Sequence, residues 1–261
     1  MPPFTDPVYL ARMRKLLIVG VVCFAVYGVA AQAPEPPIAD TRLSVHTLVR
    51  EDIFAGFLQN DLGRLARAEK NLELLLANRP ADRAPLLAWQ GSTALTRAAV
   101  AYEAGQADQF RQQYRKAGEL FAEAMKLGPN DIGVFAITGG TQTTLADRLP
   151  QAERTANWEL GYTAYQRLWT LQSAMVEKLP LHHKGELLAG LAQTAQRTGR
   201  DAEVSQQIER IIALLPDTAY SRRALEWKNN TAARSSSKLT CQTCHGPGTL
   251  AARVAEVSKQ Q

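Results

Sequence analysis

The residues with the clearest chemical potential lie near the C-terminus, in the sequence Cys241-Gln242-Thr243-Cys244-His245. Two thiols three positions apart lie on one helical turn, so both can reach the same flat ligand, and the adjacent imidazole can swing beneath it. Such a group can form thioethers with the two vinyl groups of a haem and bind its iron. The same side chains could instead form a disulfide in an oxidising compartment, or contribute ligands to a zinc site.

Residues 238–250 resemble the haem attachment segment of c-type cytochromes, including the Gly246-Pro247-Gly248 that often follows the motif. The resemblance implies a covalently attached haem c with its iron as cofactor, thioethers at Cys241 and Cys244, and His245 as the proximal iron ligand. A redox disulfide would be expected in a thioredoxin-like βαβ pattern, which the chain lacks. A zinc site would need a second pair of ligands, and the usual pair is missing.

The sixth ligand of the iron does not follow from this motif. In the common small c-type cytochromes a methionine far downstream supplies it, but only sixteen residues follow His245 and none of them is Met. A distal ligand must therefore come from the preceding chain, or the position is open to small ligands. The candidates are His182, His183, His46, Met175 and Met125. A methionine would raise the reduction potential, whereas a second histidine would give a lower one.

The N-terminus has the pattern of an export signal. Arg12, Arg14 and Lys15 precede an apolar run over residues 16–29, and Ala31-Gln32-Ala33 forms a small-residue cleavage site. The apolar run is short for a membrane-spanning helix, so we predict a signal peptide that is cleaved near Ala33. The mature protein would then be periplasmic or otherwise exported, and it would contact a membrane only if this segment stayed uncleaved.

The net charge of the chain is distributed unevenly. Of the formal charge of +5, residues 1–33 carry +2, and residues 218–261 carry seven basic against two acidic residues. The small charge of the exported chain gives no reason to expect a nucleic-acid partner. The basic C-terminal end favours an acidic redox partner and a salt-sensitive association, with a solvated basic face as the other interpretation.

Between the two ends, apolar residues recur at helical spacing and are interrupted by Gly and Pro. The best of four predicted helix pairs contains Ala117, Phe121, Ala124 and Pro129, with Gly91 on its first helix. The others are built on Gly56 with Ala68, Leu72, Leu75 and Pro80; on Phe135 and Gly139 with residues 158–178; and on Leu187 and Gly190 with Val204, Ile208, Ile211 and Pro216. Small residues at such positions let paired helices approach closely.

The pattern resembles the tetratricopeptide repeat, in which helix pairs stack into a solenoid. We therefore predict an all-α fold, an antiparallel helix-pair array with a short haem-binding tail; a generic bundle of α-hairpins is the alternative. The predicted organisation is a signal peptide (1–33), a linker (34–41), the array (42–228, ending in a capping helix over 218–228), a polar linker (229–240) and the haem attachment tail (241–261). The resemblance implies a protein-binding surface without chemistry of its own.

Together these features predict a periplasmic monohaem c-type cytochrome-like protein that transfers electrons, with the helical array docking a redox partner. The alternative is an exported helical-repeat scaffold or assembly protein, in which C-x-x-C-H is a zinc or disulfide element. A haem peroxidase is a third hypothesis, but it requires a distal acid–base group that the sequence does not identify. An electron carrier or binding protein is therefore favoured over an enzyme.

Overall fold

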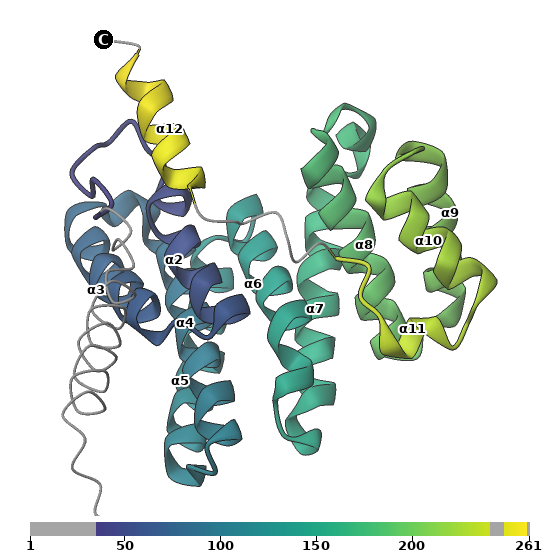
Figure 1. The fold of residues 1–261 in the computed structure, drawn as a ribbon, viewed down its shortest axis with the longest axis horizontal. Helices are drawn as coiled ribbons and strands as arrows, with labels where there is room; N and C mark the ends of the chain where they lie inside the picture. The colour runs from purple at the N-terminus through teal and green to yellow at the C-terminus, as the bar shows by residue number, and fades with distance from the viewer. Residues whose placement is uncertain (1–34, 241–247, 260–261) are drawn as a thin grey trace, which may run out of the picture. The chain divides into compact units, whose positions relative to one another are not determined.

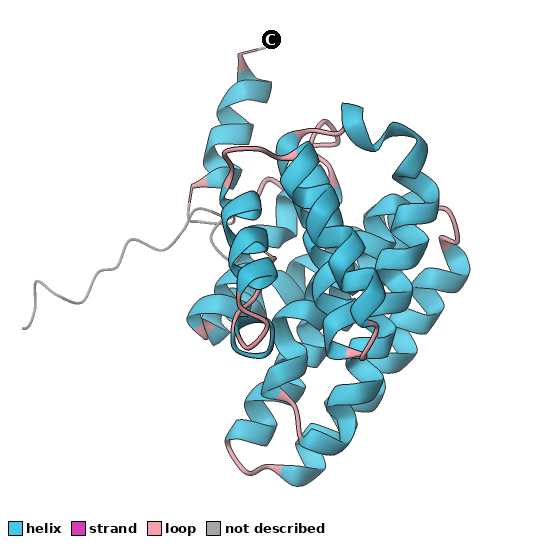
Figure 2. Ribbon diagram, turned by 90° about the vertical axis from the view of Figure 1, so that its right-hand side faces the viewer, coloured by secondary structure: helices cyan, strands magenta, loops and turns pink. Residues whose placement is uncertain are grey.

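The computed structural model describes residues 35–240 and 248–259 of the chain (Figure 1). Two units divide the chain, Met1–Pro36 and Pro37–Gln261, and almost all of the first, including the predicted signal peptide, lies outside the described residues. Every regular element of the described residues is a helix, which confirms the predicted all-α class (Figure 2). Within residues 35–240 and 248–259, no helix combines the length and the apolarity needed to cross a membrane.

Eight helices of the second unit form four consecutive antiparallel hairpins. These are α2 (Val45–Gln59) with α3 (Leu62–Asn78), α4 (Arg83–Glu103) with α5 (Ala107–Leu127), α6 (Ile132–Leu145) with α7 (Gln151–Gln172), and α8 (Leu181–Arg197) with α9 (Asp201–Leu214). The hairpins coincide with the four helix pairs predicted from the sequence. The first helices also pack on one another, α2 on α4, α4 on α6 and α6 on α8.

Short polar and glycine-containing sequences set the ends of these helices. The side chains of Ser44, Asp61 and Asp131 accept backbone N–H groups in the first turns of α2, α3 and α6. Such N-caps satisfy donors that a helix leaves unpaired. Gly105 (φ 72°) and Gly199 (φ 75°) lie in the tight connections of the second and fourth hairpins, where a left-handed backbone favours glycine. In the described part of the chain, 3-10 helices lie in three further connections, at Pro80–Asp82, Ala146–Arg148 and Ser173–Lys178.

Glycines also determine how closely the helices approach. A Cβ atom on Gly91 of α4 would lie 3.0 Å from the ring of Phe121 on α5, which is fully buried. A Cβ atom on Gly190 of α8 would lie only 2.1 Å from the ring of Tyr165 on α7. Each ring therefore occupies the space that a larger residue on the facing helix would fill.

The core consists of three apolar clusters. The largest joins α2 to α6 and includes Val257 near the C-terminus, the second joins α8, α9 and α10, and the third lies between α6, α7 and α8. Trp89, Trp158 and Trp227 are buried, and Trp169 is partly buried against two of the clusters. Each buried ring removes a large apolar surface from water and so stabilises the array.

The C-terminal part of the chain packs back onto the hairpins. Helix α10 (Ala219–Asn229) begins at the N-cap Thr218, at the position of the predicted capping helix, and packs on α9. Residues 229–240, assigned to a polar linker from the sequence, contain the short helix α11 (Ala233–Ser236), which contacts α8, and the buried Leu239. Helix α12 (Thr249–Ser258) packs on α2 (Figure 1). The two ends of the described array are therefore both in contact with the C-terminal segment.

The close contact at Gly190 gives a first prediction. The substitution Gly190→Ala adds a methyl group that would overlap with the buried ring of Tyr165. Because the surroundings are packed and the ring cannot move away freely, we expect the free energy of unfolding to fall by about 1–3 kcal/mol. Gly118→Ala on the exposed face of α5, where a Cβ meets nothing within 4 Å, should instead stabilise the protein by about 0.5–1 kcal/mol. Urea denaturation followed by circular dichroism measures both changes, and a neutral Gly190→Ala substitution would contradict the described packing.

Candidate functional site

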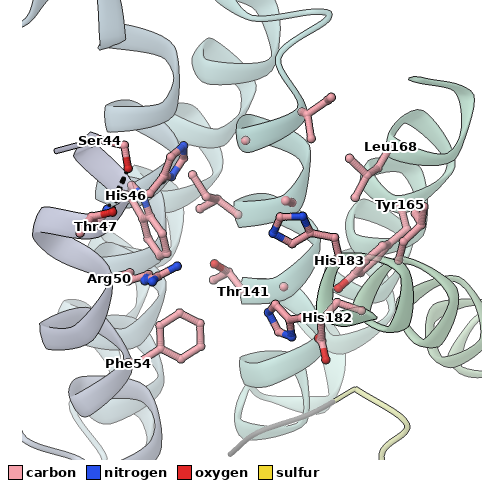
Figure 3. Close-up of a pocket in the computed structure, with 18 of the residues that line it drawn as sticks. Ser44, His46, Thr47, Arg50, Phe54, Thr141, Tyr165, Leu168, His182 and His183 are labelled. Atoms are coloured by element: carbon pink, nitrogen blue, oxygen red, sulfur yellow. Dashed lines mark hydrogen bonds between the residues drawn. The ribbon is translucent and has the colours of Figure 1, made fainter. Parts of the chain in front are cut away.

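A cavity of about 490 Å³ opens on the side of the array formed by the first helices of the hairpins (Figure 3). Its walls come from α2, α4, α6, α7 and α8, and they include the apolar side chains Phe54, Phe57, Trp89, Ile137 and Leu168. This volume is within the range of cavities that hold small molecules and cofactors, which are mostly apolar with a few polar groups.

Three of the four histidines of the chain line this cavity. His46 comes from α2, together with Arg50, and His182 and His183 come from the first turn of α8 on the opposite side (Figure 3). Three of the five candidate distal ligands, far apart in the sequence, are thus placed around one space.

The remaining candidates lie elsewhere. Met125 on α5 is partly buried and packs against two core clusters, and Met175 in the connection between α7 and α8 is half exposed. Neither lines the cavity. Cys241, Cys244 and His245 lie outside the described residues.

His46 is held by a hydrogen bond from one of the tryptophans. The indole Nε1 of Trp89 donates to Nδ1 of His46 at 3.0 Å, and the two rings meet edge to face. Because indole N–H can only donate, Nδ1 must be the unprotonated nitrogen, and the proton of the neutral ring lies on Nε2. Burial lowers the pKa of His46, the Arg50 cation acts in the same direction, and Asp131 opposes both.

His182 lies in a second polar group at the other side of the cavity. The hydroxyl of Tyr220, from α10, donates to Oε1 of Glu186 at 2.7 Å, and the Tyr220 hydroxyl oxygen lies 3.4 Å from Nδ1 of His182. Burial lowers the pKa of His182, as do the neighbouring His183 and Arg50. Both His46 and His182 are therefore neutral imidazoles at neutral pH, the form that binds metal ions.

Arg50 brings a positive charge into this cavity. Burial lowers the pKa of its guanidinium and Glu51 opposes the shift, but an arginine remains protonated in either case. Within the described part of the chain, Arg50 forms neither an ion pair nor a hydrogen bond. A partly buried cation without a protein partner is stabilised when a ligand supplies the anion.

The segment that precedes the C-x-x-C-H motif is anchored on α8 and α6. Oε1 of Gln193 on α8 accepts the backbone N–H groups of Leu239 at 2.9 Å and Thr240 at 3.3 Å. The ammonium group of Lys238 donates to the carbonyl oxygens of Thr143 and Thr144 at the C-terminal end of α6. A cation at this end of a helix also interacts favourably with the helix dipole.

The segment that follows the motif is anchored on α2. The carboxylate of Glu51 accepts the backbone N–H groups of Gly248 at 3.3 Å and Leu250 at 2.8 Å, and it also pairs with Arg64. Burial alone would raise the pKa of Glu51, but these three donors outweigh it and lower the pKa. Residues 241–247 thus connect an anchor on α8 with an anchor on α2, the two helices that carry the histidines of the cavity.

Several residues of the site were not identified by sequence reasoning. Glu186, Tyr220 and Gln193 act through tertiary contacts for which the sequence has no periodic signal. Arg50 is different, because His46, Arg50 and Phe54 follow one another at intervals of four and must share one face of a helix. That spacing of an imidazole, a cation and an aromatic ring was a signal available in the sequence.

The anchor at Glu51 yields a testable expectation. Glu51→Ala removes the charged acceptor of two N–H groups, and because hydrogen bonds to charged groups contribute about 1.5–3 kcal/mol, amide exchange in α12 should quicken about tenfold or more. Hydrogen–deuterium exchange with mass spectrometry measures this. Glu209→Ala, which removes an exposed ion pair with Lys228, should leave α12 unchanged. Equal protection of α12 in both variants and the parent would exclude the anchoring role.

The burial of His46 predicts a pH dependence of stability. The pKa of His46 is lowered from its ordinary 6.5, so the unfolded chain takes up a proton at a pH where the folded chain does not. The free energy of unfolding should therefore rise with pH up to about 6.5 and level off above it, with a slope of at most ~1.4 kcal/mol per pH unit for one group. His46→Gln keeps an acceptor for Trp89 and should reduce this slope in urea titrations between pH 5 and 7. An unchanged slope would show that His46 titrates alike in both states.

The chain was also compared with known proteins. No protein-family model matches it, and no curated protein or solved structure is significantly similar to it.

Proposed function

We propose that this protein is an exported, monohaem c-type cytochrome-like electron carrier. In this proposal the four hairpins are a tetratricopeptide-like array, haem c is attached at Cys241 and Cys244, and His245 is the proximal iron ligand. The observation that carries the proposal is the position of the C-x-x-C-H sequence in the chain. The residues before and after it are anchored on α8 and α2, and both helices form walls of a cavity of cofactor size.

The residues of the cavity fit the chemical groups of a haem. A haem has a wide apolar ring, two carboxylates and an iron atom with axial positions. Phe54, Trp89 and Leu168 offer apolar surface to the ring, Arg50 offers a cation to a carboxylate, and the neutral imidazoles offer nitrogen ligands. Each of these groups is already in place on a helix of the array.

When bound, the haem would supply one-electron oxidation and reduction. The chain would contribute the covalent tether, and the anchors at Gln193 and Glu51 would keep the tethered segment between α8 and α2. The apolar walls would exclude water from the ring, and the cation of Arg50 would stabilise a buried carboxylate. Burial and the choice of axial ligand are the levers by which a protein sets the reduction potential of such a group.

The partner in electron transfer would be an acidic protein. The chain from residue 218 onwards carries a net charge of +5, and complementary charge speeds encounter and makes association sensitive to salt. The helical array would provide the docking surface, as helix-pair arrays do for proteins and peptides.

A second function is favoured by the place of the cavity on the array. It lies along the first helices of the hairpins, the kind of face on which helical repeats bind peptides, and its lining includes the exposed Ile132. The chain would then be a scaffold or assembly protein, and C-x-x-C-H a zinc or disulfide element.

The decisive experiment is a test for covalent haem. The full chain is expressed for export together with a haem-attachment system, purified and denatured, and its pyridine haemochrome spectrum is recorded. We expect about one haem per chain in the parent and in Ser235→Ala/Ser236→Ala, a double substitution just before the motif, and none in Cys241→Ala/Cys244→Ala. If the parent carries no haem and behaves like the double variant, the cytochrome proposal is wrong and the scaffold function stands.

A further inference from the structure

The three histidines of the cavity differ in the hydrogen bonds that their ring nitrogens make, and these bonds determine which nitrogen is available to iron. Histidine binds a metal ion through an unprotonated nitrogen, and a hydrogen bond at the other nitrogen usually fixes the tautomer. The contacts of His46, His182 and His183 can therefore be compared with this requirement.

His46 does not meet it. Its Nδ1 accepts the proton of Trp89, so Nε2 is protonated. Nε2 is also covered by the start of α6, because a Cβ atom on Gly133 would lie 2.8 Å from it. If His46 bound iron through Nε2, its proton would have to move to Nδ1. Nδ1 and the indole N–H of Trp89 would then be two donors 3.0 Å apart, and a buried N–H would lose its acceptor.

His182 meets the requirement. Because the Tyr220 hydroxyl donates its proton to Glu186, its oxygen, 3.4 Å from Nδ1 of His182, is placed to accept the proton of that nitrogen. This places the proton of the neutral ring on Nδ1 and the lone pair on Nε2. A hydrogen bond from the other ring nitrogen to a fixed acceptor orients a metal-binding histidine and raises its basicity, and here the acceptor is a hydroxyl that is itself held by a carboxylate.

The position of Tyr220 depends on a glycine in α8. A Cβ atom on Gly185 would lie 2.2 Å from the Tyr220 ring. Only glycine at this position lets the Tyr220 ring lie across α8, where its hydroxyl contacts Glu186 and His182. Helix α10 itself is fixed by the capping box of Thr218 and Ser221. The group that holds His182 is therefore built into the packing of two helices.

His183 lies beside His182 but has no such support. Its ring centroid is 5.9 Å from that of His182, its side chain is exposed, and among the described residues it makes no hydrogen bond. It therefore provides a matched comparison for His182 in the same turn of α8.

We infer that His182 supplies the distal axial ligand of the haem iron through Nε2, with Tyr220 and Glu186 as positioning residues; this inference rests on the proposed cytochrome function. The iron would then have two histidine ligands, His245 from the motif and His182 from α8. Such a pair gives a six-coordinate, low-spin iron of lower potential than a histidine–methionine pair.

The test uses the full haem-loaded chain and two separate readouts. The pyridine haemochrome of the denatured protein reports covalent attachment, whereas electron paramagnetic resonance and visible spectra of the folded protein report the axial ligands. We expect a low-spin parent and a low-spin His183→Ala variant. His182→Ala should retain covalent haem but lose the low-spin signal, bind carbon monoxide when reduced, and recover the low-spin spectrum on addition of imidazole.

Two further variants keep the test independent of folding defects. His182→Met should stay low-spin with a raised midpoint potential, and Tyr220→Phe should stay low-spin with a shifted potential because Nδ1 loses its acceptor. A high-spin parent, a His182→Ala variant that stays low-spin, or loss of the low-spin signal in His183→Ala or His46→Ala would overturn the assignment. Absence of haem in the denatured parent would instead refute the cytochrome function itself.

Discussion

The site depends on the small side chains along one face of α6. This helix lies between α2 and α8, and between the two isoleucines Ile132 and Ile137 and beyond them it presents only small residues to the cavity, Gly133, Ala136, Gly140 and Thr141. Larger residues there would fill the space between the two outer helices. The cavity is therefore a consequence of what α6 lacks, and the side chains of α2 and α8 face each other across it (Figure 3).

The same helix is also held in place by polar and aromatic contacts with its neighbours. The hydroxyls of Ser92 on α4 and Thr141 are 2.6 Å apart in a fully buried hydrogen bond. Tyr165 from α7 fits against both Gly139 and Gly190, where a Cβ atom would lie 2.8 Å and 2.1 Å from its ring. One aromatic ring thus sets the spacing of α6, α7 and α8, and a buried hydrogen bond ties α6 to α4.

The sequence was informative about helices and much less so about the site. Residues such as Gly91, Ala117 and Phe121 marked the hairpins because close helix packing imposes a local spacing of small and large side chains. The gathering of His46 with His182 was not predictable, because it depends on how α2 and α8 are placed by the helices between them. The polar composition of residues 229–240 favoured a linker, yet it did not show that Gln193 would bind their backbone, since a glutamine in a helix has no pattern that marks its partner.

The contact between Glu51 and Leu250 joins residues 199 positions apart. Arrays of helix pairs are built from local contacts, and each pair can in principle fold without the rest of the array. The contact with α12 cannot form until the end of the chain has been made, and it ties the first hairpin to the last segment. Long-range contacts of this kind raise the contact order and slow the final step of folding. The contact between α12 and α2 therefore forms late, after the hairpins that it joins have made their own local contacts.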